Sequence, residues 1–255
     1  MIEVKDLSKR FGKVEVLKNI NAKFQKGLVN QIIGKSGSGK SVLAKCMVGL
    51  HKPEKGQVFY EGRSFHEMSP LEKREIRQEI GMLFQGSALF DSLTVLQNVM
   101  FPLQMFATTS KKEMEERARH CLKRVNILDK DNLFPAELSG GMQKRVGIAR
   151  AIAMNPKYLF CDEPNSGLDP QTSILIDDLI KEITEEFNTT TVVITHDMNS
   201  VMETGDNIVF IHAGQMWWSG SKDELLHSDN KELNEFIFAS GLMRQVKKAM
   251  TGGNR

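Results

Sequence analysis

Features typical of secreted and membrane proteins are missing from this sequence. Its 255 residues include only three cysteines, Cys46, Cys121 and Cys161, which lack the close spacings of zinc and redox sites. No stretch approaches the roughly 18 apolar residues that a membrane-spanning helix needs. The segment Met1–Asp6 does not begin an apolar run of the signal-peptide type. We therefore expect a soluble chain in a reducing, cytosolic compartment, attached to a membrane only through a partner.

The sequence also has almost no excess charge of either sign. Its 34 basic and 32 acidic residues give a formal net charge of +2. This balance argues against a nucleic-acid-binding protein held mainly by bulk positive charge, and leaves room only for a local basic patch. With 40% hydrophobic residues, a chain of this length can bury a sizeable core. Either one large domain with subdomains or two small domains fits its length.

Strand-like and helix-like patterns alternate along most of the chain. The predicted strands are 29–33, 80–84, 158–161, 191–194 and 207–211, and the predicted helices include 40–50, 170–187 and 197–204. Strands that alternate with helices imply a mostly parallel sheet covered on both faces. The residues before position 30 alternate with a period of two instead, which predicts an antiparallel β subdomain.

The region of about 87–150 reads as a mostly helical insertion between two halves of this α/β core. Apolar residues recur there at spacings of three and four, which predicts a helix over 111–128 with one buried face. That face consists of Ala118, Cys121, Leu122, Val125 and Leu128. A second helix is predicted over 140–153.

A glycine-rich segment, the phosphate loop, follows the strand predicted at 29–33. Residues 34–41 read Gly-Lys-Ser-Gly-Ser-Gly-Lys-Ser and match the pattern G-x-x-x-x-G-K-[ST]. Glycines let the main chain curl so that several N–H groups face one anion, and the next helix presents its positive end to that anion. Lys40 adds a full charge for the β- and γ-phosphates, and the Ser41 hydroxyl can bind Mg²⁺.

The strand before this loop and the helix after it favour a site for ATP and Mg²⁺ over an accidental glycine-serine turn. The predicted contacts of the nucleotide in this part of the chain are Gly34, Lys35, Ser36, Gly37, Ser38, Gly39, Lys40, Ser41 and Val42.

Two adjacent carboxylates, Asp162 and Glu163, end the apolar strand predicted at 158–161. Ligands gather at the carboxyl ends of the strands in a parallel sheet, so Asp162 is expected beside the phosphate loop as a Mg²⁺ ligand. Neighbouring residues on a strand point in opposite directions, so Glu163 is available to polarise the water that attacks the γ-phosphate. Such a pair on its own is usually a solvated turn, and only the phosphate loop upstream favours the catalytic interpretation.

Further motifs occur in a defined order around these two. Residues 138–142 (Leu-Ser-Gly-Gly-Met), the signature segment, precede the acidic pair, and 166–169 (Ser-Gly-Leu-Asp) follow it. Gln85 lies between the phosphate loop and the helical insertion, and His196 follows the strand predicted at 191–194. Over about residues 1–240, this order and spacing resemble the ATP-binding cassette of ABC transporters.

The resemblance implies a fold and a set of boundaries. The fold is a P-loop NTPase of the ABC cassette type, with a RecA-like, mostly parallel sheet core, an N-terminal antiparallel β subdomain and a helical signature subdomain. The ABC ATPase domain would span residues 1–240 with the helical subdomain at about 87–150, and residues 241–255 would form a C-terminal tail.

The resemblance also implies roles for individual residues near the γ-phosphate. Gln85 would contact Mg²⁺ and the attacking water, and His196 would donate a hydrogen bond to the γ-phosphate. Lys40, Gln85, Glu163 and His196 would then be the catalytic residues, and Ser41, Gln85 and Asp162 the metal ligands.

Other implied contacts involve a second copy of the chain. Ser139, Gly140 and Gly141 would contact the γ-phosphate of ATP held by that copy, because small residues at a helix N-terminus offer N–H groups to an anion. Asp169 would lie at the seam of this homodimer, and Phe11 would stack on adenine. Two departures stand out. Met142 occupies a position where the family usually has glutamine, and Phe11 one where tyrosine is more usual.

Residues 83–95 and the signature segment are similar to the ATPase of the Mla/Mce-type phospholipid transport systems of bacteria. This similarity implies integral membrane permease subunits as partners, with an Mce-type substrate-binding protein and an accessory subunit as further candidates. The chain would then lie peripherally on the cytoplasmic face of the inner membrane and bind no nucleic acid. The alternative is the ATPase subunit of an importer for small solutes such as amino acids.

Several assignments stay open on the sequence alone. Leu89, Phe90 and Leu93 form either an apolar surface for a permease helix or ordinary packing within the helical subdomain. The apolar residues of 236–246 suit a clasp on another subunit, a packed terminal helix or a helix near lipid headgroups.

Two other functions fit less well. A non-transport cassette acting on DNA or ribosomes usually has two cassettes, coiled coils or zinc motifs, and a small-molecule kinase would explain neither the signature segment nor His196.

Overall fold

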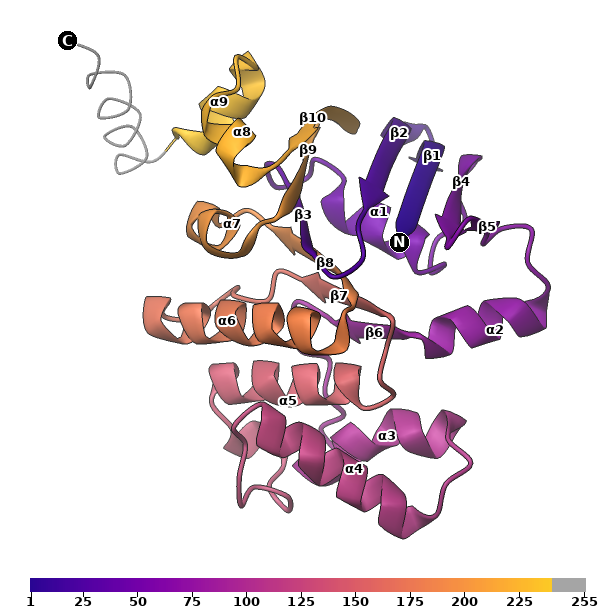
Figure 1. The fold of residues 1–255 in the computed structure, drawn as a ribbon, viewed down its shortest axis with the longest axis vertical. Coiled ribbons are helices and arrows are strands. Elements are labelled where there is room, and N and C mark those ends of the chain that lie inside the picture. The colour runs from indigo at the N-terminus through magenta and orange to yellow at the C-terminus, as the bar shows by residue number, and fades with distance from the viewer. Residues whose placement is uncertain (240–255) are drawn as a thin grey trace.

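The strands of the computed structural model, which describes residues 1–239, form two sheets (Figure 1). The larger sheet contains β3 (Val29–Ile33), β6 (Ile80–Leu83), β7 (Tyr158–Asp162), β8 (Thr190–Thr195), β9 (Asn207–His212) and β10 (Gln215–Gly220), in the order β10-β9-β3-β8-β7-β6. The smaller sheet contains β1 (Ile2–Phe11), β2 (Val14–Phe24), β4 (Lys55–Tyr60) and β5 (Arg63–Ser64), in the order β2-β1-β4-β5.

The larger sheet is parallel except for its edge strand β10, which pairs antiparallel with β9. Every residue of β3, β7 and β8 is buried, as expected for parallel strands covered on both faces. In the smaller sheet β1 pairs antiparallel with both β2 and β4. The predicted α/β fold, with a mostly parallel core and an antiparallel N-terminal part, is therefore confirmed.

Helices cover the larger sheet and extend beyond it. They are α1 (Lys40–Met47), α2 (Pro70–Gln78), α3 (Val95–Phe106), α4 (Lys111–Arg124), α5 (Gly140–Ile152), α6 (Pro170–Phe187), α7 (Met198–Thr204), α8 (Lys222–Leu226) and α9 (Lys231–Ile237), with a 3₁₀ turn at Pro135–Glu137. Helices α3, α4 and α5 pack together at the end of the molecule away from the smaller sheet, and α6 lies beside α5 (Figure 1). Within residues 1–239, no helix combines the length and the apolar character needed to cross a bilayer.

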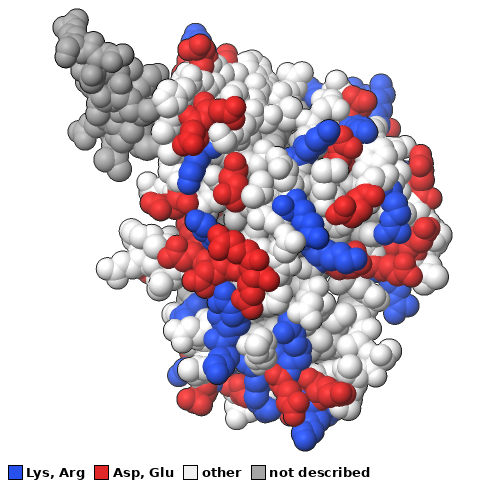
Figure 2. Space-filling model, viewed as in Figure 1, with Lys and Arg blue, Asp and Glu red and all other residues white. Residues whose placement is uncertain are grey.

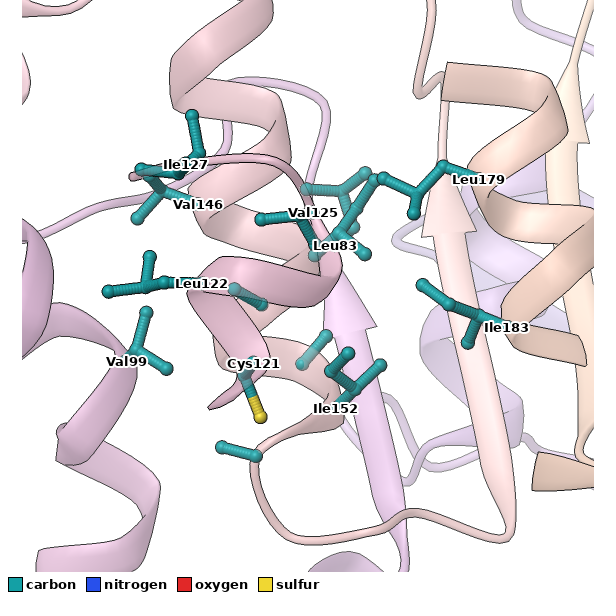
Figure 3. Packing of buried hydrophobic residues seen from close by; sticks show 14 of the residues in the cluster. Leu83, Val99, Cys121, Leu122, Val125, Ile127, Val146, Ile152, Leu179 and Ile183 are labelled. Atoms are coloured by element: carbon teal, nitrogen blue, oxygen red, sulfur yellow. The ribbon is translucent and has the colours of Figure 1, made fainter. Parts of the chain in front are cut away.

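A continuous apolar core joins the three helices α3–α5 to the larger sheet. Figure 3 shows Leu122 and Val99 packed beside Val146, with Leu83 from β6 and Ile183 from α6 nearby. The apolar face predicted for residues 111–128 is buried, except that Leu128 is 54% exposed. The reason is local: α4 ends at Arg124, and Asn126 turns the main chain with a φ of 54°.

Charged side chains add a second link between the helices. Figure 2 shows acidic side chains gathered over the position of α6, with basic side chains directly below them. Arg124 of α4 pairs with Glu182 at 3.1 Å and with Glu186 at 2.6 Å, both on α6. Because both glutamates are exposed to solvent, each pair contributes no more than about 1 kcal/mol, and the apolar core dominates. The predicted tail, 241–255, lies outside the described residues.

Candidate functional site

An open cleft of about 1140 Å³ lies at the carboxyl edge of the larger sheet. Its walls come from the phosphate loop and α1, from the residues that follow β7 and β8, from Gln85 and Val16, and from the end of α9 at residues 236–239. The parallel register explains this convergence, because Ile33 pairs with Thr195 and Asp162 pairs with Ile194. The last residues of β3, β7 and β8 therefore lie along one edge, where ligands collect in open α/β sheets.

Glycine is required at two positions of the phosphate loop. Gly34 has a φ of 148°, and a Cβ there would collide with the carbonyl oxygen of Ile211. Gly39 has a φ of 107°, and a Cβ there would lie 2.7 Å from Leu17. Gly39 also supplies no side-chain cap to α1, so the N–H groups of the first helical turn remain available to an anion.

Lys40 is held across the loop by its own main chain. Its Nζ donates to the carbonyl oxygens of Gly34 at 2.8 Å and of Lys35 at 3.2 Å. Burial lowers the pKa of Lys40, and the carboxylates of Glu163 and Asp162 partly oppose this effect. The Ser38 hydroxyl is buried in the same loop without a hydrogen-bond partner in the described chain. A buried cation and an unpartnered donor fit the oxygens of a bound phosphate group.

The predicted magnesium ligands also come together. Ser41 Oγ donates to Asp162 Oδ1 at 3.0 Å, and Gln85 lines the same cleft. Burial raises the pKa of Asp162, while the hydrogen bond from Ser41 lowers it. Hydroxyl, carboxylate and amide oxygens suit Mg²⁺, which commonly takes one or two protein ligands and completes its shell with water and phosphate oxygens. The donor set therefore fits the metal that accompanies ATP.

Glu163 and His196 face each other across the ends of β7 and β8. The Nδ1 atom of His196 lies 2.8 Å from Glu163 Oε2 and 2.9 Å from Oε1. Glu163 has a φ of 49°, which turns the chain away from β7, and its N–H donates to Ile194 at 2.9 Å. Since a positive φ is costly for a residue with a side chain, the pairing of β7 with β8 must hold it in place. Sequence reasoning proposed both residues, but it did not predict their contact.

The signature segment lies outside this cleft. Ser139 caps α5 by accepting a hydrogen bond from the Met142 N–H at 3.3 Å, and Asp169 caps α6 by accepting one from Thr172 at 3.0 Å. A Cβ on Gly141 would lie 2.5 Å from Thr172, so the two helix N-termini are closely packed. Within the described chain, neither the signature residues nor Asp169 line the cleft that holds the phosphate loop. The phosphate-loop residues and the signature residues, both predicted to contact nucleotide, are thus separate groups within one chain.

Phe11 is not part of the cleft wall. It ends β1, is 44% exposed, and places its ring against His51 with centroids 5.2 Å apart. Its stacking on adenine stays a prediction. One apolar residue that does line the cleft is Val16 of β2, which lies next to Gly39. No local motif marks Val16, so it could not be predicted as a cleft residue.

A buried carboxylate behind the cleft joins two of its walls. Asp177 of α6 is 6% exposed and accepts hydrogen bonds from Asn165 Nδ2 and Ser200 Oγ, both at 2.8 Å. Asn165 belongs to the loop after β7, and Ser200 to α7, just after His196. Burial raises the pKa of Asp177 to about 6, although both hydrogen bonds act in the opposite direction. Sequence reasoning missed this residue, because only the fold brings its partners together.

Known proteins resemble this chain over most of its length. The protein family described as "ABC transporter" matches residues 17–166. The methionine import ATP-binding protein MetN of Desulfitobacterium hafniense (strain Y51) is 39% identical over 242 residues, which are 93% of this chain and 71% of that protein. The "Probable ribonucleotide transport ATP-binding protein mkl" of Mycobacterium leprae (strain TN) is 35% identical over 92% of this chain and 68% of its own length.

Two solved structures are similar over most of the chain. One is a dimeric ATP-binding cassette in a post-hydrolysis state with ADP and Pi bound, with a TM-score of 0.79, 35% identity, and coverage of 87% of this chain and 98% of that chain. The other is cbiO1 of Clostridium perfringens, part of the transporter complex cbiONQ, with a TM-score of 0.82, 29% identity and 98% coverage of both chains.

The raised pKa of Asp177 predicts a specific dependence of stability on pH. Between its ordinary value of 3.8 and about 6, the folded protein keeps a proton that the unfolded chain has released. The contribution of this group to the free energy of unfolding should therefore fall as pH rises through that window, by roughly 3 kcal/mol in total, and stay constant above it. The free energy of unfolding can be measured by urea unfolding at several pH values for the wild type and for Asp177→Asn. The wild-type value minus the variant value should show this fall.

The exposed Glu185, on the same helix, provides the matched control. The corresponding difference for Glu185→Gln should change little over the same range. An equally flat difference for Asp177→Asn would show that the buried carboxylate titrates normally and that its burial does not affect its charge.

Proposed function

Because the chain belongs to the ABC transporter family and is an ATPase that uses ATP with Mg²⁺, we propose that two copies close around two ATP molecules to drive a membrane permease. One observation carries this proposal. The phosphate loop with Ser41 and Glu163 lines one cleft, with Asp162 hydrogen-bonded to Ser41, whereas the signature segment of the same chain lies outside that cleft. Two copies arranged head to tail would bring one chain's signature segment to the other chain's cleft. The dimeric form of the related cassette supports this arrangement.

The residues proposed to bind ATP and Mg²⁺ then have distinct roles. The main chain of the phosphate loop and Lys40 bind the phosphates, and Ser41, Asp162 and Gln85 hold Mg²⁺. The bound metal supplies charge stabilisation at the phosphate oxygens. Glu163 accepts a proton from the attacking water, and His196 donates to the γ-phosphate. The Nδ1 atom of His196 contacts Glu163, so the proposed base and the proposed γ-phosphate donor lie side by side.

The signature residues of the partner chain complete the ATP pocket. Ser139, Gly140 and Gly141 offer the first N–H groups of α5, whose helix dipole favours an anion. Asp169 caps α6 beside them and holds this surface in shape. Neither the phosphate-loop residues nor the signature residues alone surround a triphosphate, so hydrolysis depends on closure of the dimer.

The permease is proposed to dock in an apolar groove of about 390 Å³ beside the cleft. Phe90, which is 42% exposed, lines this groove together with Phe101 and Phe106. Asn98 is fully buried and holds the main chain of Phe90 on both sides, accepting from its N–H at 2.8 Å and donating to its carbonyl at 3.1 Å. Leu89 packs against the helical core instead. Through this contact the chain would associate peripherally with the cytoplasmic face of the inner membrane.

The proposed cargo is a small solute, such as an amino acid, that is imported. The relatives named as methionine import proteins support small-solute import over phospholipid transport. The phospholipid interpretation rests on residues 83–95 and the signature segment alone, and the comparisons support neither it nor an Mce-type partner. Permease subunits remain the partners that this proposal requires.

Removal of the proposed general base should stop hydrolysis without preventing ATP binding. Glu163→Gln keeps the size of the side chain and loses the carboxylate, so turnover should fall at least ~100-fold. Binding of a fluorescent ATP analogue should change little. Glu185→Gln, at an exposed position of α6, is the control and should keep normal turnover. Near-normal hydrolysis by Glu163→Gln would reject the assigned role.

A charge placed in the apolar groove should separate the ATPase from its permease. Phe90→Asp should no longer co-purify with an integral membrane protein from detergent extract, because a carboxylate would be buried in the contact. The variant should still bind ATP. Val14→Asp, at a residue that is 64% exposed in the hairpin of β1 and β2, should co-purify normally. Equal capture by both variants would place the permease elsewhere.

The captured complex also tests the cargo. Reconstituted into vesicles, it should show ATP hydrolysis that an amino acid stimulates, together with accumulation of that amino acid. Hydrolysis that responds only to phospholipid would favour the lipid transporter instead.

A further inference from the structure

Lys144 is a buried cation that the proposed mechanism does not use. It lies on α5, two residues beyond the signature segment, and is 5% exposed. Its Nζ donates to the main-chain carbonyl of Gln85 and to that of Glu163, the latter at 3.3 Å. Burial lowers the pKa of Lys144, and nearby acidic groups, Asp162 and Glu163 among them, partly oppose this. A buried ammonium group is costly, so these two contacts require an explanation.

The two acceptors of Lys144 belong to the two segments that meet at the attacking water. Gln85 is a proposed metal ligand, and Glu163 is the proposed base. Both segments have unusual main-chain conformations, since Glu163 has a φ of 49° and Ser87, just after Gln85, has one of 61°. Segments in such conformations persist only when their surroundings hold them.

Helix α5 is well placed to hold these segments. A Cβ on Gly147 would lie 2.7 Å from Leu83, so the helix approaches β6 closely. Six residues past Lys144, Arg150 donates to the carbonyl oxygens of Ser87 and Ala88, both at 2.7 Å. Two cations of one helix therefore bind main-chain oxygens of the segment 85–88, and only Lys144 also reaches Glu163.

We propose that Lys144 is a positioning residue, which ties the signature helix α5 to Gln85 and Glu163 and so sets the proposed base in place. The inference rests on the proposed function of Glu163. Its consequence is a direct link between the two ATP sites of a dimer. The N-terminus of α5 would face the partner's nucleotide, and the same helix would hold the main chain of Glu163 in its own chain.

The chemistry of lysine fits this task. An ammonium group has three donors and no acceptor, so it can bind two carbonyls at once. Methionine has a similar length and apolar stem but no donor, and arginine has donors on a longer, planar group. Replacing Lys144 with methionine therefore removes the hydrogen bonds but keeps the side-chain packing, whereas replacing it with arginine keeps donors.

The first test compares turnover with ATP affinity. Lys144→Met should lower kcat about tenfold or more, as expected for the loss of charge-assisted hydrogen bonds, with the KM for ATP changed less than about threefold. Lys144→Arg should recover most of the lost kcat. Lys144→Leu, which also lacks a donor, supplies the same comparison if the methionine variant does not fold. A folded variant without the donor and with a normal kcat would overturn the inference.

A matched control addresses stability alone. Arg117 donates to the carbonyl oxygens of Ile152 and Ala153, at 2.9 and 3.0 Å, near the opposite end of α5. Arg117→Met should lower the melting temperature and leave kcat within about threefold of the wild type. An equal loss of kcat in Arg117→Met would show that Lys144 acts only through the stability of α5, against the inference.

The second test asks whether Lys144 acts through Glu163. In the Glu163→Gln background, Lys144→Met should cause no further loss of turnover, because the group that it positions is already gone. A further tenfold loss would overturn the inference. If Glu163→Gln alone kept normal turnover, the proposed function of Glu163 would fail instead, so the two failures are distinguishable.

Discussion

The hydrogen bond from Ser41 to Asp162 joins residues that are 121 positions apart in the sequence. It exists because β3 and β7 both pair in parallel with β8, so that their carboxyl ends share one edge. A shift of this register by one residue would turn the side chains of a strand to the other face of the sheet. The cleft, its proposed metal ligands and the position of Glu163 all depend on this pairing.

Ionisable groups are concentrated in and behind this edge, at a cost to stability. Lys40, Lys144, Asp162 and Asp177 are each less than 10% exposed, and burial shifts the pKa of each toward its neutral form. Such groups cluster at functional sites, where charge must be available in a dry setting. The apolar cores on both faces of the sheet offset the cost and keep these groups in place. The same packing holds the positive φ of Glu163.

Local motifs in the sequence were enough to predict the phosphate loop, Asp162 and the alternation of strands and helices. Side-chain contacts over long distances were not predictable, because the fold alone brings Lys144 to Gln85 or Asp177 to Ser200. Helix α2 was missed, although Ser69, Pro70 and Glu72 form a capping box with proline at the first turn, a signal present in the sequence. The roles of Phe11 and of the signature residues remain predictions. Phe11 lies outside the cleft, and the signature residues would contact ATP only in a dimer.

The molecular mass of the Glu163→Gln variant in solution with ATP and Mg²⁺, measured by sedimentation equilibrium, tests the central claim most directly. The account predicts a change from the 28.8 kDa of one chain to twice that value. Adding Ser139→Asp, which keeps a good cap on α5 but places a negative charge before the phosphate, should hold the variant monomeric. A monomer that binds ATP in the first variant, or a dimer in the second, would contradict a site built from two chains.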